Sequence, residues 1–82
     1  MHEVGIANGI LDAVRKETEA RKPARAVKVG VRIGEMAGID PQSLAFSFEV
    51  LVKGSDLEPL DLAIEPGVAD ELEFAYLELE VP

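Results

Sequence analysis

Residues 26 to 35 read AVKVGVRIGE, and this stretch decides the fold. From Val27 to Gly34 every second position carries a β-branched side chain, and the positions between them carry a charge or a glycine. A period of two with β-branched residues is typical of a strand with one buried face. We therefore predict a strand from Ala26 to Glu35. The members of its buried face are Val27, Val29, Val31 and Ile33.

A helix is predicted before this strand, from Glu3 to Arg21. Ile6, Ile10 and Val14 recur at every fourth position, which places them on one helical face. Lys22-Pro23 ends the helix, because a residue before proline avoids helical backbone angles. Two glycines, Gly5 and Gly9, weaken the helix slightly and allow another segment to approach one face.

A second helix is predicted after the strand. Asp40-Pro41 is a strong start, because Asp40 can cap the helix and Pro41 suits its first position. The apolar positions Leu44 and Phe48 continue the pattern towards Val52. The helix is expected to stop there because a glycine follows shortly afterwards.

Two more strands complete the chain. Residues 60–65 alternate in period two, and Pro66-Gly67 is a turn signal. Residues 71–81 also alternate, but the apolar phase slips by one residue near Ala75-Tyr76, which predicts a bulge or bend there. We expect these last two strands to join directly as a hairpin. The expected fold is therefore α/β (α+β), a single domain in the order α-β-α-β-β, with two helices on one face of a three-stranded sheet.

Composition excludes several classes of function. The chain has 82 residues, no cysteine and one histidine, so cysteine metal sites, thiol nucleophiles and sites that need two histidines are ruled out. The net charge of −8 argues against nucleic acid and anionic membranes as partners. No apolar run is long enough for a membrane span or a secretion signal, so we expect a cytoplasmic protein. No phosphate loop or carboxylate pair stands out, and we expect no enzyme activity.

The first three residues are the strongest candidate for chemistry. The amine of Met1, the amide and imidazole nitrogens of His2 and the amide nitrogen of Glu3 can close adjacent chelate rings on one ion. A planar nitrogen set of this kind suits Ni(II) or Cu(II) rather than zinc or magnesium. Asp40 is a further candidate ligand, although a helix cap is its commoner role. The alternative for His2 is an irrelevant, frayed terminus.

The order of motifs resembles the HypA family of hydrogenase nickel-insertion proteins. The resemblance covers nearly the whole chain. It rests on Met1-His2-Glu3-Val4 with Ile6, Ala7, Ile10 and Leu11; on residues 27–41; on Phe46, Phe48-Glu49-Val50-Leu51 and Lys53-Gly54; and on residues 62–65, 71–74 and 77–80.

This resemblance implies a nickel domain in which the terminal amine, His2 and Glu3 bind Ni(II) as transient cargo. It also implies two partners, a HypB-like nickel GTPase and the precursor of the [NiFe]-hydrogenase large subunit; some family members serve urease. The family carries a zinc module with two Cys-x-x-Cys pairs between its last two strands. Here that interval is only about residues 66–70 and holds no cysteine, so we expect the zinc module, and zinc itself, to be absent.

Two hypotheses follow from the sequence. In the first, the domain is a nickel metallochaperone of the HypA type without zinc. In the second, it is a metal-independent interaction module that keeps the fold and docks on a maturation partner or forms a homo-oligomer. Replacing His2 with alanine separates them, because only the first predicts a loss of nickel binding.

Overall fold

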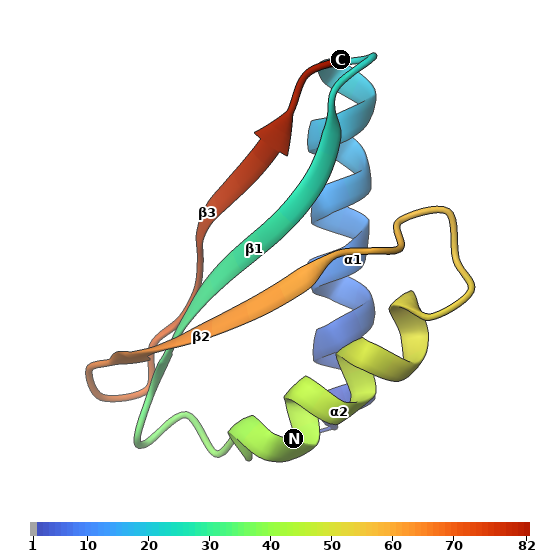
Figure 1. Ribbon diagram of the computed structural model, residues 1–82. Coiled ribbons are helices and arrows are strands. Elements are labelled where there is room, and N and C mark those ends of the chain that lie inside the picture. The colour runs from blue at the N-terminus through green and yellow to red at the C-terminus, as the bar shows by residue number, and fades with distance from the viewer. Residues whose placement is uncertain (1) are drawn as a thin grey trace.

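The computed structural model describes residues 2–82 and contains two helices and three strands (Figure 1). They follow one another in the predicted order α-β-α-β-β, and each boundary falls within two residues of its expected place. The elements are α1 (Glu3–Ala20), β1 (Arg25–Gly34), α2 (Pro41–Val52), β2 (Asp61–Gly67) and β3 (Leu72–Glu80).

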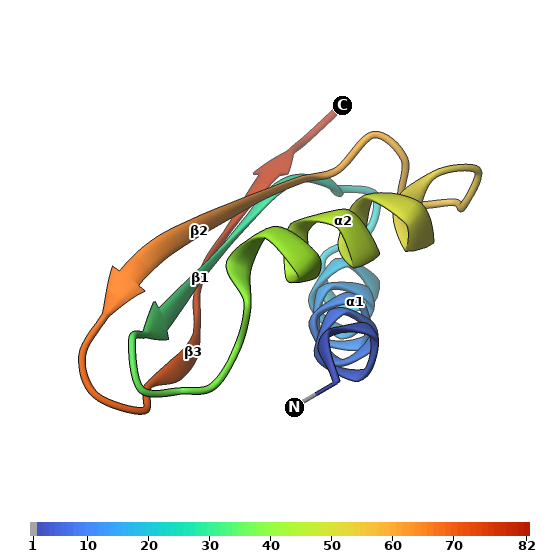
Figure 2. The same cartoon turned by 90° about the horizontal axis from the view of Figure 1, so that it is seen from below.

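The strands form one mixed sheet in the order β2-β1-β3. β2 runs parallel to β1, with Val29 opposite Leu62, and β3 runs antiparallel to β1, with Val29 opposite Leu77. Both helices lie on the same side of this sheet (Figure 2). The predicted class, a small α+β domain with two helices over a three-stranded sheet, is confirmed. Neither helix of the described part, residues 2–82, is long and apolar enough to cross a membrane.

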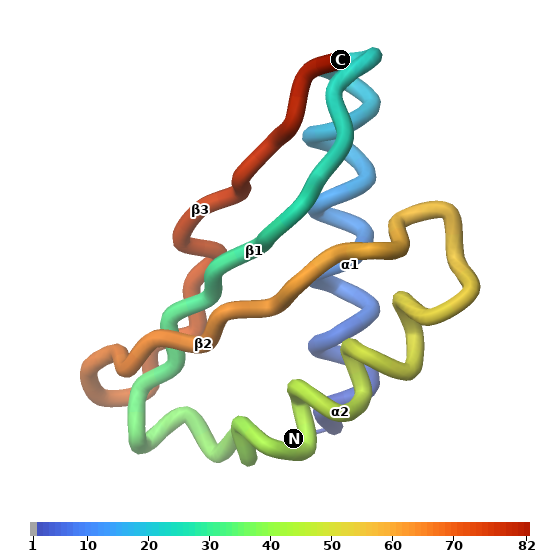
Figure 3. The backbone as a smooth tube through the Cα atoms, viewed as in Figure 1, coloured from blue at the N-terminus to red at the C-terminus, as the bar shows by residue number. Residues whose placement is uncertain are grey.

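The predicted hairpin between β2 and β3 is wrong, because β1 lies between these strands. After Gly67 the chain crosses the end of β1 and returns along its other edge (Figure 3). The crossing is held by the Gly34 amide, which donates to the Glu71 carbonyl at 2.8 Å, and by the Met36 amide, which donates to the Ala69 carbonyl at 2.8 Å. It needs the glycine, because a Cβ on Gly34 would lie 2.1 Å from the Ala69 carbonyl oxygen.

The core lies between the helices and the helix-facing side of the sheet. The apolar stripes predicted for the helices supply much of it, and the central strand and Leu60, just before β2, add to it. Val27, predicted to lie on the buried face of β1, is only half-buried and Ala26 is buried instead, because the pairing of β1 with β3 shifts register between Ala26 and Lys28. Burying a valine or leucine side chain stabilises the fold by about 1.5–3 kcal/mol relative to leaving it in water. The side chains that are less than 2% exposed and largest in volume are Leu44, Val14, Val29 and Val31.

The predicted irregularity in the last strand is confirmed as a bulge at Ala75. Phe74 lies opposite Val31 and Tyr76 lies opposite Gly30, so Ala75 has no partner of its own. The bulge keeps the apolar residues on both sides of it on the helix-facing side, because residues directly opposite one another share a face. It also leaves the Tyr76 ring over Gly30 on the other face, where a Cβ on Gly30 would lie 2.1 Å from the ring.

The face of the sheet turned away from the helices carries charge. We call it the open face. Arg32 on β1 forms ion pairs with Glu73 on β3 and, at 3.7 Å between Nη2 and Oε1, with Glu65 on β2. Arg25 pairs with Glu80 at 3.4 Å. The basic first half and acidic second half of the sequence therefore lie side by side, although solvent-exposed pairs such as these stabilise the fold by at most about 1 kcal/mol each.

Candidate metal centre

His2 is the N-cap residue of α1. Its backbone is extended, with φ −92° and ψ 109°, and its carbonyl oxygen accepts a hydrogen bond from the Ile6 amide at 3.2 Å. Its side chain is exposed and makes no capping hydrogen bond, so the imidazole is not committed to the helix. Met1, the other residue expected to supply a terminal nitrogen, lies outside the described residues. The helix thus begins directly after the candidate imidazole.

Glu3 joins the first turns of the two helices. Its Oε2 atom accepts a hydrogen bond from the backbone amide of Asp40 at 3.2 Å. The two residues are far apart in the sequence, and they meet because α1 and α2 pack against each other with their N-terminal ends together. No local pattern signals this contact, and sequence reasoning missed it. It fixes the start of α1 against the rest of the molecule.

Asp40 caps α2, as its position before Pro41 predicts. Its Oδ1 atom accepts from the Gln42 amide and its Oδ2 atom accepts from the Ser43 hydroxyl, both at 3.0 Å. Each oxygen of the carboxylate therefore already satisfies a group of the first helical turn. The structure brings Asp40 beside Glu3, but as a cap with both oxygens engaged.

No group of three or more His, Cys, Asp or Glu side chains within residues 2–82 is arranged to hold a metal ion. A metal at this end of the molecule would therefore rely on backbone nitrogen. The first amides of an α-helix have no partner within the helix, so the amide of Glu3 is available for this purpose. The positive end of the helix dipole opposes a cation. The carboxylates of Glu3 and Asp40 lie at the same end and offset that field.

A metal site made only of side chains is therefore less suited to this terminus than a planar set of backbone and side-chain nitrogens. Such a set combines an amine, an imidazole and deprotonated amides, which favours Ni(II) or Cu(II). Its affinity rises with pH, since the amine, imidazole and amides must all give up protons.

Comparison with known proteins places the chain among nickel metallochaperones. Residues 1–70 match a family described as "Hydrogenase/urease nickel incorporation, metallochaperone, hypA". A hydrogenase maturation factor HypA from Methanobrevibacter smithii is 38% identical over 65 residues, which cover 79% of this chain and 52% of that protein. The corresponding factor from Streptomyces avermitilis is 39% identical over 72 residues, covering 84% of this chain and 55% of that protein.

The fold has a counterpart of known structure. The nickel metallochaperone HypA from Helicobacter pylori superimposes with a TM-score of 0.73 at 20% identity, covering 82% of this chain and 58% of that one. The chain therefore spans little more than half the length of these relatives. A metallochaperone carries a metal and is not an enzyme, as we expected from the sequence.

Proposed function

The chain belongs to the HypA family of nickel metallochaperones, and on this premise we propose that it captures Ni(II) at the start of α1 as cargo for hydrogenase maturation. The proposed ligands are the amine of Met1, the amide and imidazole nitrogens of His2 and the amide nitrogen of Glu3. They form the planar nitrogen set that suits this ion.

The hydrogen bond from the Asp40 amide to the Glu3 carboxylate is the observation that carries the proposal. A terminal site on a frayed chain loses affinity, because metal binding must first order the backbone. Here α1 begins at Glu3, and the same residue is tied to α2. The backbone that supplies two of the nitrogens is therefore ordered before the metal arrives. In this proposal the Glu3 side chain holds the helix start in place, and its backbone nitrogen binds the metal.

Delivery is a further part of the proposal. The relatives are named as hydrogenase maturation factors, and we propose the same pathway for this chain, in the cytoplasm, with a nickel GTPase and a hydrogenase large-subunit precursor as partners. We propose no zinc for the domain, because none of its 82 residues is cysteine and His2 is its only histidine. Nickel then leaves with its recipient and is not a resident cofactor.

The test is a Ni(II) titration of a protein prepared so that Met1 is its first residue, which mass spectrometry verifies. Heat and the visible spectrum are recorded together. We expect one nickel per chain, a planar-nickel absorption band and tighter binding at pH 8 than at pH 6 (roughly a tenfold change for each proton released per pH unit). A variant with Gly-Ser added before Met1 removes the terminal amine, and His2→Ala removes the imidazole. Both should lose the band, whereas Lys53→Ala at the far end of α2 should keep it.

Equal nickel binding by the extended protein would refute the terminal site. A complete lack of binding by the authentic protein would favour the second hypothesis, that the domain acts as a metal-independent interaction module. A pull-down of the candidate partners with His2→Ala would then retain them.

A further inference from the structure

The open face of the sheet is striped by charge. β1 contributes Arg25, Lys28 and Arg32 along the centre of the sheet. β3 places an acidic residue opposite each of the three, and β2 places one opposite Lys28 and one opposite Arg32. On β2, Asp61 lies opposite Lys28 and Glu65 lies opposite Arg32. The sequence of stripes across the sheet is thus acidic, basic, acidic. The acidic stripe on β3 consists of Glu73, Glu78 and Glu80, opposite Arg32, Lys28 and Arg25 in that order.

β3 is also an open edge. Within residues 2–82 it pairs with β1 on one side only, so half of its backbone donors and acceptors face outward without a strand partner there. The opposite edge of the sheet, β2, is shorter and contains Pro66, which has no amide hydrogen to donate. β3 runs for nine residues without a proline. Of the two edges, β3 is the one suited to receive another strand.

An apolar hollow adjoins this edge on the helix-facing side. It has a volume of about 270 Å³ and lies between α1 and β3. Leu72 and Phe74 form its β3 wall and remain 46% and 37% exposed. On α1 the hollow is lined by Gly9 and Ala13, whose small side chains leave space, and a Cβ on Gly9 would meet nothing within 4 Å. The sequence pattern already set this glycine apart as a place where another segment can approach the helix.

We propose that the outer edge of β3 binds an extended segment of another protein in which apolar residues alternate with lysine or arginine. Side chains of an added strand alternate between the two faces of the sheet. The apolar residues would enter the hollow between α1 and β3. The basic residues would lie on the open face beside Glu73, Glu78 and Glu80. They would add a basic stripe next to the acidic stripe of β3. The proposal concerns a protein partner and does not depend on the nickel site.

The same charges select against a second copy of this chain. Two β3 edges placed side by side would bring acidic residues opposite acidic residues, and like charges directly opposite destabilise a strand pair. A β2 edge is acidic as well and carries Pro66. The acidic stripe on β3 therefore both excludes self-pairing and specifies a basic strand.

The experiment uses a fluorescein-labelled peptide of nine residues in which valine alternates with lysine. Fluorescence anisotropy measures its binding to the 82-residue protein, and amide hydrogen exchange locates it. We expect saturable binding, with slower exchange confined to the outward amides of residues 72–80. Two control peptides are used: one has glutamate in place of lysine, and one is N-methylated at alternate residues so that it cannot pair with an edge. Neither should bind.

Two pairs of variants test the hollow and the stripe separately. Gly9→Leu fills the hollow, and it should weaken binding by about tenfold or more, because one apolar side chain of the peptide loses its place. Gly5→Leu on the same helix is its matched control, because a Cβ on Gly5 also meets nothing within 4 Å and Gly5 does not line the hollow. Helical side chains lean towards the N-terminus, so a leucine at this position points away from the hollow. Glycine replacement raises helix propensity, so both proteins should fold.

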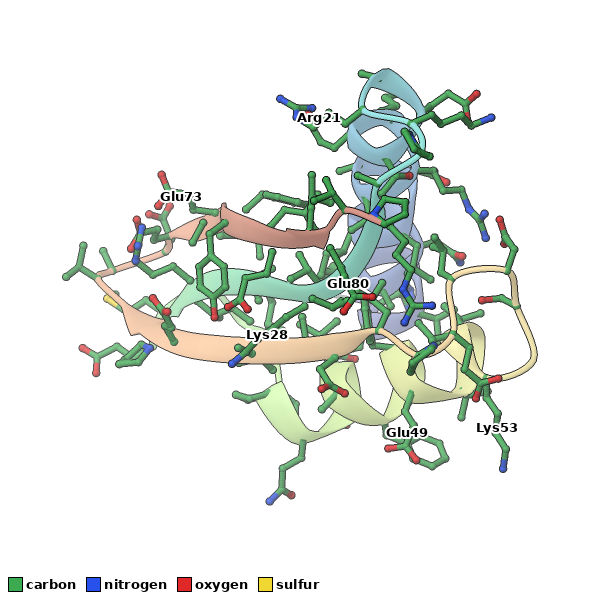
Figure 4. The ribbon with its side chains drawn as sticks, turned by 45° about the horizontal axis from the view of Figure 1, so that its top comes forward. Arg21, Lys28, Glu49, Lys53, Glu73 and Glu80 are labelled. Carbon is green, nitrogen blue, oxygen red and sulfur yellow. The ribbon has the colours of Figure 1, made fainter. Side chains whose placement is uncertain are left out.

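Glu78→Lys reverses one charge of the acidic stripe on β3. It should weaken the binding of the lysine peptide and restore some binding of the glutamate peptide. Its control, Glu49→Lys, makes the same change on exposed α2, away from β3 (Figure 4), and should alter the affinity by less than about twofold. Equal binding of all three peptides, protection outside β3, or equal affinity in Gly9→Leu and Gly5→Leu would overturn the proposal. So would a dimer of the free protein that protects the β3 amides.

Discussion

Replacing Asp40 separates its role as a helix cap from a role as a metal ligand. Asp40→Ala removes the acceptors of two hydrogen bonds at the start of α2, from the Gln42 amide and the Ser43 hydroxyl. Loss of an aspartate cap costs about 1 kcal/mol of folding free energy, within a range of about 0.5–2 kcal/mol. Asp40→Asn keeps an oxygen that can accept from the same amide, and asparagine caps helices about as well as aspartate. We therefore expect a change of less than about 0.5 kcal/mol for Asn.

The link to Glu3 is preserved in both variants, because the donor is the backbone amide of residue 40 and not its side chain. The start of α1 should accordingly remain fixed. For a domain of this size, 1 kcal/mol corresponds to a fall in Tm of about 4–8 °C. Nickel affinity measured at 25 °C, where both variants are folded, should stay within about threefold of the parent protein, which is about 0.7 kcal/mol.

Two measurements therefore decide the matter. Urea unfolding gives the stability of the parent, Asp40→Ala and Asp40→Asn proteins, and calorimetric titration gives their nickel affinities. The reasoning is refuted if Asp40→Asn keeps its stability but binds nickel more than about tenfold more weakly, since the carboxylate would then be a ligand. It is refuted equally if Asp40→Ala is as stable as the parent.

Three further predictions concern the fold. Gly34→Ala places a Cβ against the backbone of the segment that crosses β1 and should destabilise the protein by about 1–3 kcal/mol in urea unfolding, whereas a mobile crossing would absorb the methyl group without loss. Leu44→Ala removes a side chain that is 0% exposed and should cost about 2–5 kcal/mol by the same measurement; a smaller loss would mean that the core collapses around the gap. The hydrogen bond from Arg15 lowers the pKa of Asp56, so this pair stabilises the fold above the unfolded pKa of the carboxyl, and the contribution disappears as the pH falls through the folded value. In Arg15→Ala the pKa of Asp56 should rise in an NMR titration, and an unchanged pKa would contradict the pairing.

The elements of the fold were predictable from sequence because each is specified by a local pattern. The alternation in residues 26–35 marks β1, and the change of phase near Ala75 marks the bulge. The cap of α2 was equally predictable, because Asp40 precedes Pro41 and a cap acts within a few residues. In each case the residues that determine the structure are neighbours in the chain.

The arrangement of the strands was not predictable in this way. The interval between β2 and β3 is short enough for a hairpin and also long enough to cross the end of β1. The close approach of Val68 and Ala69 to Gly34 decides between a hairpin and a crossing. The alternation of apolar residues in the two strands does not predict this approach. The contact between Glu3 and Asp40 was missed for the same reason, since it exists only after the helices have packed. The nickel ligands remain a prediction, and Met1 is outside the described residues.

The central place of β1 also has a consequence for how the protein is made. Both strands that pair with β1 follow it in the chain, and β3 is made after β2. The segment that supplies several of the most deeply buried side chains therefore leaves the ribosome before either of its partners exists. During this interval α1, made before β1, and α2, made directly after it, are the elements that can shield it. A chain that stalls before β3 presents β1 with a free edge, and that stage of synthesis is the point of greatest exposure to aggregation and the natural point for a chaperone to act.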